Sequence, residues 1–137
     1  MVKKWIVMSV IILCIVGLCV GENLYIQASF AFLKENLVQI QESLSVDTEN
    51  INTQENILAL ENLHTEWRKR AKVLKTLVWH TGMKEVEINL SRILTYTEQN
   101  DYKEAVVELN ALLDFSDHYM NDFTINLENI LCKLPSF

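Results

Sequence analysis

WIVMSVIILCIVGLCV, residues 5–20, determines on which side of a membrane the rest of this chain lies. It begins at Trp5, ends at Val20 and contains no charged residue. A helix over this run and the following glycine is about 25 Å long, just short of a hydrocarbon core of about 27–30 Å. Lys3 and Lys4 precede the run and can reach the headgroup layer. The run therefore predicts a transmembrane helix in contact with membrane lipid.

A cleaved signal peptide is the alternative for the same stretch. Secretory signals have a basic start, an apolar centre of about 7–15 residues and small residues at the cleavage site. The run here is longer than that, and the sequence before Gly21 is a poor cleavage site. In both cases the positive-inside bias keeps the N-terminal lysines in the cytoplasm. We therefore predict a single-pass protein of the cell membrane, with residues 1–21 as anchor or signal and residues 22–137 as an extracytoplasmic domain.

The domain after the anchor is acidic and poor in helix breakers. It holds all 18 acidic residues and 10 of the 12 basic ones, so its formal charge is −8. This charge argues against nucleic acid as a partner and against adhesion to an anionic membrane surface. The chain has three glycines and one proline, Pro135, which predicts an all-α fold. Cys132 is the one cysteine of the domain, so an internal disulfide is excluded.

Heptad spacing marks the first helix of the domain. Six apolar residues recur at intervals of four and three positions. They are Ile26, Phe30, Leu33, Leu37, Ile40 and Leu44. Such a seam packs against other helices, either of the same chain or of a second copy. Polar residues at positions 45–53 then predict a connection.

Three further amphipathic segments follow the connection. The second helix is predicted to run to about His80, with Gly82 as the glycine that follows its end. Asn100 and Asp101 predict a turn and an N-cap between the third and fourth helices. The predicted architecture is an N-terminal transmembrane helix followed by an antiparallel four-helix bundle with a short C-terminal helix or turn. The third and fourth helices are expected over residues 83–99 and 102–120, and the terminal turn or helix over 124–131.

A basic patch interrupts the acidic character of the domain. Five basic residues lie within eight positions of the second helix, on the side opposite the apolar stripe that contains Trp67. They are Arg68, Lys69, Arg70, Lys72 and Lys75. One interpretation is a solvated face paired with neighbouring acidic residues. The other is a surface for an anionic partner or a cell-surface polyanion.

The sequence contains no motif that indicates catalysis. It has no Gly-rich phosphate loop, His-Glu-x-x-His, Cys-x-x-Cys or nucleophile elbow. Glu61 and His64 have the Glu-x-x-His spacing of di-iron bundles, but those bundles need two such motifs. A ligand site at His80 and Glu85 is an alternative to a simple helix-end histidine. We predict a protein that is not an enzyme and carries no cofactor or metal.

The order and spacing of several residues resemble a domain-of-unknown-function family. Its members are small, single-pass, membrane-anchored helical proteins of clostridia-like spore-forming bacteria. The resemblance implies a bacterial protein on the outer face of the cytoplasmic membrane and implies no activity. It covers nearly the whole chain and rests on Trp67-Arg68-Lys69-Arg70, His80, Glu85-Val86-Glu87, Arg92, Tyr96 and Asn126-Leu127-Glu128-Asn129-Ile130-Leu131. The family-like positions where a partner or ligand site is expected are Trp67, His80, Glu85, Arg92 and Asn129.

Two functions follow as expectations. The first is a membrane-tethered binding or scaffolding module without catalysis, which binds a protein partner or associates with itself. The second is a sensor-type bundle that binds a small ligand or a metal between its helices. Polar groups buried in the bundle would mark the second, and the candidates for such groups are His64, His80 and His118.

Overall fold

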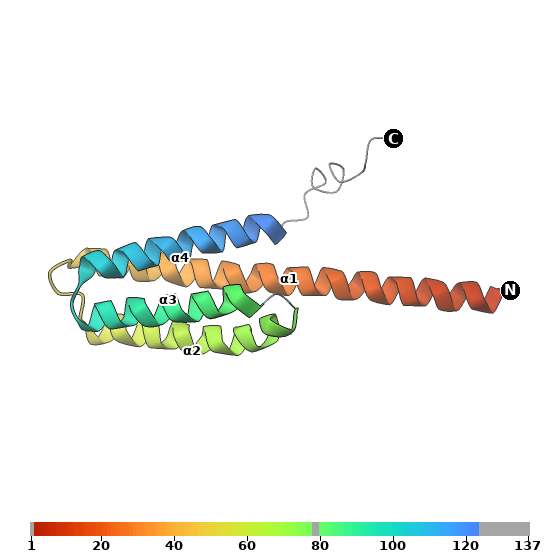
Figure 1. Ribbon diagram of the computed structural model, residues 1–137, viewed down its shortest axis with the longest axis horizontal. Coiled ribbons are helices and arrows are strands. Elements are labelled where there is room, and N and C mark those ends of the chain that lie inside the picture. Colours follow the sequence, from red (N-terminus) through yellow and green to blue (C-terminus); the bar gives the residue numbers. More distant parts are fainter. Residues whose placement is uncertain (1, 78–79, 124–137) are drawn as a thin grey trace, which may run out of the picture.

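Four α-helices make up the part of the chain that the computed structural model describes, residues 2–77 and 80–123, and no strand occurs in these residues. The all-α class predicted from the scarcity of helix breakers is thus confirmed for them. In Figure 1 the second half of α1 lies beside the other three helices, while its first half projects alone from the bundle. The helices are α1 (Val2–Val46), α2 (Gln54–Leu77), α3 (His80–Glu98) and α4 (Tyr102–Phe123).

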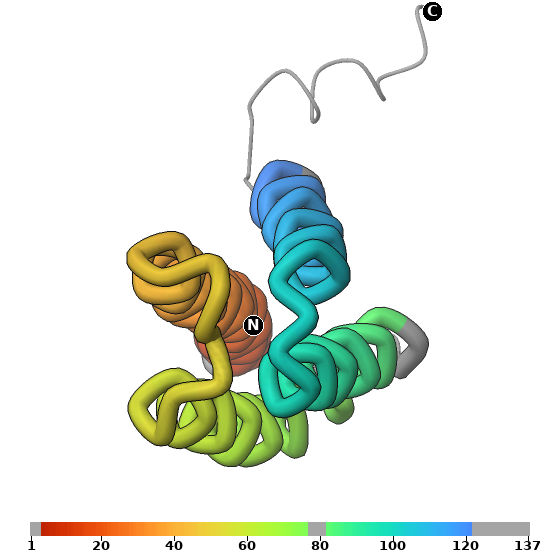
Figure 2. The backbone as a smooth tube through the Cα atoms, turned by 90° about the vertical axis from the view of Figure 1, so that its left-hand side faces the viewer, coloured from red at the N-terminus to blue at the C-terminus, as the bar shows by residue number. Residues whose placement is uncertain are grey.

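The helices pack around one core as a square. In the view along the bundle in Figure 2, α1 lies beside α2 and α4, and α3 lies beside the same two helices. Both connections that the structure describes, after α1 and after α3, lie at the end of the bundle away from the projecting part of α1 (Figure 1). The opposite end, where α2 ends and α3 begins, is the end from which α1 projects. We call it the anchor-side end.

Asn100 joins the two connections at the far end. Its Oδ1 accepts hydrogen bonds from the backbone N–H of Ile51 (2.8 Å) and of Asn52 (3.1 Å). Its Nδ2 donates to the backbone carbonyl of Glu49 (2.6 Å). The residue has a φ of 59°, in the left-handed region that asparagine tolerates better than most side chains. Asp101 then caps α4 by accepting from the N–H of Glu104 (3.2 Å), as the predicted N-cap requires.

The heptad seam of α1 packs inside its own chain. All six of its residues are buried. The ring of Phe30 meets Trp67 of α2 edge-on, with centroids 5.4 Å apart, and stacks on Tyr119 of α4 at 4.9 Å. Of the two partners that the sequence left open for the seam, α2 and α4 of the same chain are the ones it contacts. Trp67 is completely buried in this aromatic cluster.

The predicted break at Gly82 was wrong, because Gly82 lies inside α3, which begins at His80. Its φ is not positive, so the residue has no turn to make. A Cβ built there would lie 2.7 Å from Tyr119 Oη, 3.1 Å from Tyr119 Cζ and 3.2 Å from Phe115 Cζ. Glycine thus lets α3 approach two aromatic rings of α4 without displacing them. A glycine that follows a helix and a glycine at a helix contact look the same in a sequence.

Gly82→Ala should destabilise the fold. Alanine favours a helix interior by about 1 kcal/mol over glycine, but the new methyl group would displace Tyr119 from the rings of Phe30 and Phe115 that it contacts. Overpacking of this kind costs about 1–3 kcal/mol, so we expect a net loss of about 1 kcal/mol. Thermal unfolding of the full chain in detergent, followed by circular dichroism, measures it. In a double-mutant cycle Tyr119→Phe should recover part of the loss by removing the closest atom. A stabilised Gly82→Ala variant would contradict the packing described.

The projecting half of α1 is apolar and uncovered. Every residue from position 5 to position 20 is exposed, and Leu18 retains 73% of its side-chain surface. Among the described residues, one helix is long and apolar enough to cross a membrane, over Lys4–Val46. A signal sequence near an N-terminus satisfies the same criterion, so the two interpretations of residues 5–20 both stand on this observation. The predicted C-terminal turn or helix at 124–131 lies outside the described residues.

Candidate functional site

The basic patch occupies the half of α2 that approaches the anchor-side end. Arg68, Lys69 and Lys72 are exposed. Arg70 is turned toward α1, where its guanidinium carbon lies 4.1 Å from the centre of the Phe32 ring, a cation–π contact. Lys75 reaches α3 and pairs with Glu87 (Nζ to Oε1, 2.9 Å). Four of the five residues of the patch therefore face solvent or α3, and the fifth covers an aromatic ring of α1.

Two adjoining grooves between α2 and α3 collect the basic side chains. One has a volume of about 480 Å³ and is lined by α2 residues of the patch together with Glu87. The other, also of about 480 Å³, shares Arg68 and Glu87 with the first. We name the two together the basic groove; its charged and titratable residues are His64, Arg68, Lys69, Lys72, Lys75, Lys84, Glu87 and Arg92. Six of these are basic and one is acidic, which gives the groove a positive potential on an acidic domain.

Acidic neighbours neutralise only part of the groove. Lys69 pairs with Glu66 on α2, and Lys75 pairs with Glu87 on α3. Arg92 pairs with Glu108 of α4 over 3.4 Å. Within residues 2–77 and 80–123, Arg68, Lys72 and Lys84 make no ion pair. The interpretation as a solvated, neutralised face thus accounts for the paired residues. It does not account for Arg68, Lys72 and Lys84, which have no ion-pair partner among the described residues.

His64 lies in the groove, where burial and the charge of Arg68 both act on its pKa. Partial burial lowers the pKa of its imidazole below the ordinary value of 6.5, and the charge of Arg68 lowers it further, while Glu87 acts in the opposite direction. Because the pKa is lower in the folded chain, the unfolded chain takes up a proton first as the pH falls through 6.5. His64 therefore makes the fold less stable toward acid pH and has no such effect above neutral pH.

Arg68→Gln should raise the pKa of His64 without bringing it fully to 6.5, since burial remains the larger cause. An NMR titration of the imidazole C2 proton in the full chain measures the midpoint. Lys72→Gln is the matched control, because it removes the same charge from α2 but is not among the causes of the shift. A midpoint above 6.5 in the unaltered chain, or an equal rise in both variants, would contradict this electrostatic description.

Of the five family-like positions, the structure describes the side chains of Trp67, Glu85 and Arg92. Trp67 lies in the core, and no described residue bonds its buried indole N–H. Glu85 is exposed on α3, and Arg92 lies in the basic groove. His80 is the first residue of α3 and its side chain is outside the described part, as is the whole of Asn129. Arg92 therefore lies in the same groove as residues of the basic patch, whereas Trp67 lies in the core.

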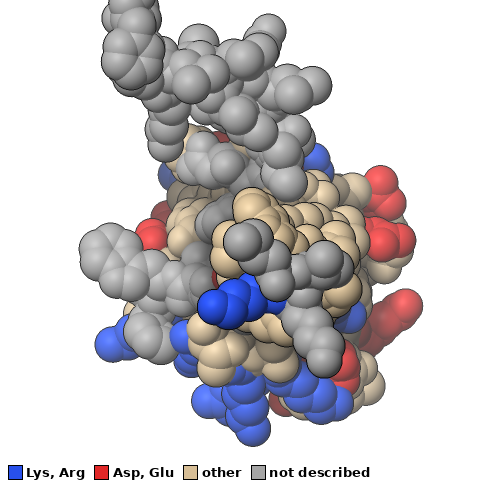
Figure 3. All heavy atoms as spheres, turned by 90° about the vertical axis from the view of Figure 1, so that its right-hand side faces the viewer, with Lys and Arg blue, Asp and Glu red and all other residues tan. Residues whose placement is uncertain are grey.

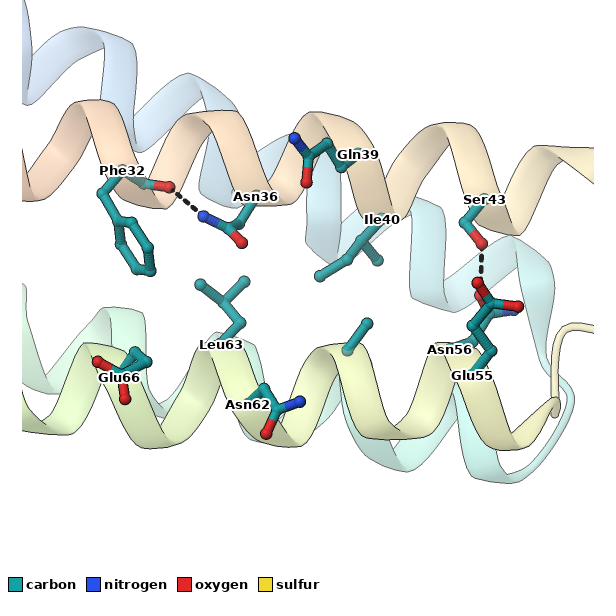
Figure 4. A pocket seen from close by; sticks show the side chains of 11 residues that line it. Phe32, Asn36, Gln39, Ile40, Ser43, Glu55, Asn56, Asn62, Leu63 and Glu66 are labelled. Carbon is teal, nitrogen blue, oxygen red and sulfur yellow. Dashed lines mark hydrogen bonds between the residues drawn. The ribbon is translucent and has the colours of Figure 1, made fainter.

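A second groove, between α1 and α2, was not predicted from the sequence. It has a volume of about 450 Å³ and carries amide side chains on both helices (Figure 4). Asn56 is buried there; it accepts from the Ser43 hydroxyl (2.6 Å) and donates to the carbonyl of Ile51 (2.9 Å). We name this the amide groove, lined by Phe32, Asn36, Gln39, Ile40, Ser43, Glu55, Asn56, Ala59, Asn62, Leu63 and Glu66. Asparagine residues spaced along two helices do not predict a groove from the sequence alone, because the sequence does not show which faces of the two helices lie side by side.

Metal ligands are not gathered in the part of the chain that the structure describes. No group of three or more His, Cys, Asp or Glu side chains that could hold a metal ion occurs in it. Glu61, of the Glu-x-x-His motif, is exposed, and His64 lies in the basic groove.

Comparison with known proteins gives one result at the level of the family. No curated protein matches the chain, and no solved structure matches it either. A family model described as "Domain of unknown function (DUF4363)" matches residues 20–130, which take in the last residue of the apolar run and all of the helical bundle. The chain therefore belongs to the DUF4363 family of domains of unknown function.

Proposed function

We propose that this protein is a membrane-anchored, non-catalytic binding or scaffolding module. The observation that carries the proposal is the continuity of α1, which is apolar and exposed over residues 5–20 and forms one wall of the bundle core from Ile26 onward. Burying the exposed half in a bilayer removes its apolar surface from water. The bundle is then held at a fixed distance from the membrane by a helix without a flexible linker. The absence of catalytic motifs from the sequence supports a binding role.

The proposal includes an orientation and an arrangement. Lys3 and Lys4 remain on the cytoplasmic side and the bundle is extracytoplasmic, supported by the positive-inside bias. The bundle is an antiparallel one, supported by Phe30 contacting both Trp67 and Tyr119 while Asn100 ties the connections at the other end. The origin in a clostridia-like spore former stays a prediction of the family resemblance. A cysteine at exposed Val107, labelled in intact cells by a membrane-impermeant maleimide, tests the orientation.

Photo-crosslinking tests the binding role in living cells. A photoreactive residue at Thr65 or Thr95, which line the basic groove, should give discrete covalent adducts with a partner protein or a second copy. The matched control is Val107, 54% exposed on α4. Adducts from the groove positions alone support the proposal. No adduct, or the same adducts at the same yield from Val107, would contradict it.

A small-ligand sensor is the second candidate, and the amide groove is the observation that favours it. Its amides can donate and accept hydrogen bonds, which suits a neutral polar organic molecule. Ser43 and Asn56, joined across the groove in Figure 4, would sense such a molecule by rearranging. Native mass spectrometry of the full chain released from its own membranes tests this. A stoichiometric small-molecule adduct that Asn56→Ala abolishes supports the sensor, and a bare chain in every preparation contradicts it.

A further inference from the structure

Charges of opposite sign are separated along α2. The first half of α2 carries Glu55 and Glu61 and no basic residue, while positions 68–77 carry five basic residues and no acidic one. The far end of the bundle is acidic, with Lys103 its basic exception. The acidic residues there are Asp47, Glu49, Glu55, Glu98, Asp101 and Glu104. The net charge of the domain hides this separation of sign.

The basic residues lie at the level of the membrane surface if residues 5–20 span the bilayer. Trp67 contacts Phe30, so these two residues share a level. Val20 lies ten residues from Phe30 and Lys75 lies eight from Trp67, toward the same end of the bundle. At a rise of 1.5 Å per residue these distances are about 15 Å and about 12 Å. The backbone of Lys75 therefore lies within about one helical turn of the level of Val20.

The headgroup layer is thick enough to include these side chains. Bilayer and hydrocarbon thicknesses of about 40–45 Å and 30 Å leave roughly 5–8 Å for each headgroup layer. Lys75 falls within that layer and Lys72, one turn back, falls near its outer edge. Lys84 on α3 precedes Glu87, the partner of Lys75, by one turn and lies at the same end. Lys72 and Lys84 are exposed and make no ion pair within the described residues.

Figure 3 looks onto the anchor-side end and shows an asymmetry. Lys and Arg side chains gather in the lower part of the view, where α2 lies, and acidic side chains gather on another side. Glu85 is exposed at this end and Glu22 is half-exposed there. A tilt of α1, which averages about 20° for transmembrane helices, would bring the α2 side down onto the bilayer.

We infer that Lys72, Lys75 and Lys84 bind the headgroups of anionic phospholipids and thereby set how the bundle sits on the membrane. The inference rests on the proposed membrane anchor and reverses the expectation from net charge that the domain avoids anionic membranes. The basic side chains of α2 are attracted to the surface and the acidic far end is repelled by it, so both effects hold the α2 side of the bundle close to the bilayer. Lysine binds phosphate groups as a point charge, so phospholipid headgroups are suitable ligands for these side chains.

The test places a fluorescent probe beside the three lysines and a quencher in the headgroups. Val73→Cys carries the probe, in a full chain whose Cys14, Cys19 and Cys132 are changed to alanine; Val73 is 44% exposed. The chain is reconstituted into phosphatidylcholine vesicles containing a nitroxide-headgroup lipid and an increasing fraction of phosphatidylglycerol. We expect quenching to rise with phosphatidylglycerol. In about 1 M salt, where the Debye length is about 3 Å, the rise should disappear.

Lys72→Gln/Lys75→Gln/Lys84→Gln is the decisive variant. Each lysine near an anionic surface contributes roughly a five-fold preference, so the phosphatidylglycerol fraction that gives half the rise should increase at least about three-fold. Lys34→Gln/Lys103→Glu lowers the charge by the same three units farther from the anchor and should leave that fraction unchanged. Retention in alkaline-washed vesicles with quenching independent of lipid charge, or equal shifts in both variants, overturns the inference and leaves the anchor standing. Failure to remain in washed vesicles of any composition overturns the anchor itself.

Discussion

Ile12→Lys/Leu13→Lys should release the full chain from the membrane. Both residues lie at the middle of residues 5–20 and are exposed, by 55% and 70%. Each lysine at the centre of a transmembrane helix costs roughly 2.5–3.5 kcal/mol on the insertion scale, so the pair costs roughly 5–7 kcal/mol. We expect the variant to leave the alkaline-washed membrane fraction, measured by quantitative immunoblotting of pellet and supernatant.

The control places the same two charges on the bundle. Leu58→Lys/Val107→Lys changes apolar side chains of similar exposure, 45% and 54%, on α2 and α4. It should stay in the membrane fraction with the unaltered chain. If both double variants partition alike, the apolar run does not hold the protein in the bilayer, and the interpretation of α1 as an anchor fails.

Trp67→Ala should lower the free energy of unfolding by about 3–5 kcal/mol, the usual cost of removing a large aromatic side chain from a core. The ring is fully buried and meets Phe30 edge-on, so its loss opens a cavity where α1 and α2 meet. Urea unfolding of the full chain in detergent, followed by far-ultraviolet circular dichroism, measures the change. Val73→Ala, on the same helix but exposed, should cost less than about 1 kcal/mol.

Trp67→Phe separates packing from hydrogen bonding at this position. No described residue bonds the indole N–H, so phenylalanine forfeits no hydrogen bond to the described part of the chain and loses only part of the ring. We expect less than half the loss seen for alanine. A loss for phenylalanine as large as for alanine would mean that the N–H has an essential partner, and would revive Trp67 as a site residue.

Periodicity in the sequence predicted most of the helical core. The heptad seam of α1 and the stripes of the other helices are set by the period of 3.6 residues, which local sequence expresses directly. The six residues of the heptad seam, from Ile26 to Leu44, were predicted on one side of the helix and all are buried. The turn at Asn100 was also predicted, because asparagine is a residue type that is typical of turns.

Features that depend on two elements at once were missed. Gly82 was assigned to a helix end because nothing local reveals Tyr119 and Phe115 beside it. The links from Asn100 to Glu49 and Ile51 join residues about fifty positions apart. The residues of the basic patch were identified from the sequence. Its position at the anchor-side end depends on how α2 packs against α1. The contribution of Lys84 and Arg92 depends on how α2 packs against α3.

The central claim, that residues 5–20 remain on the protein and hold its bundle at a membrane, is tested most directly by intact mass. The protein is expressed from its full sequence, membranes are washed at alkaline pH, and the mass of the chain in each fraction is measured. We expect the mass of a chain that retains residues 5–20, found in the washed membranes. A chain that begins near Gly21 and appears in the soluble fraction would show a cleaved signal and contradict the account.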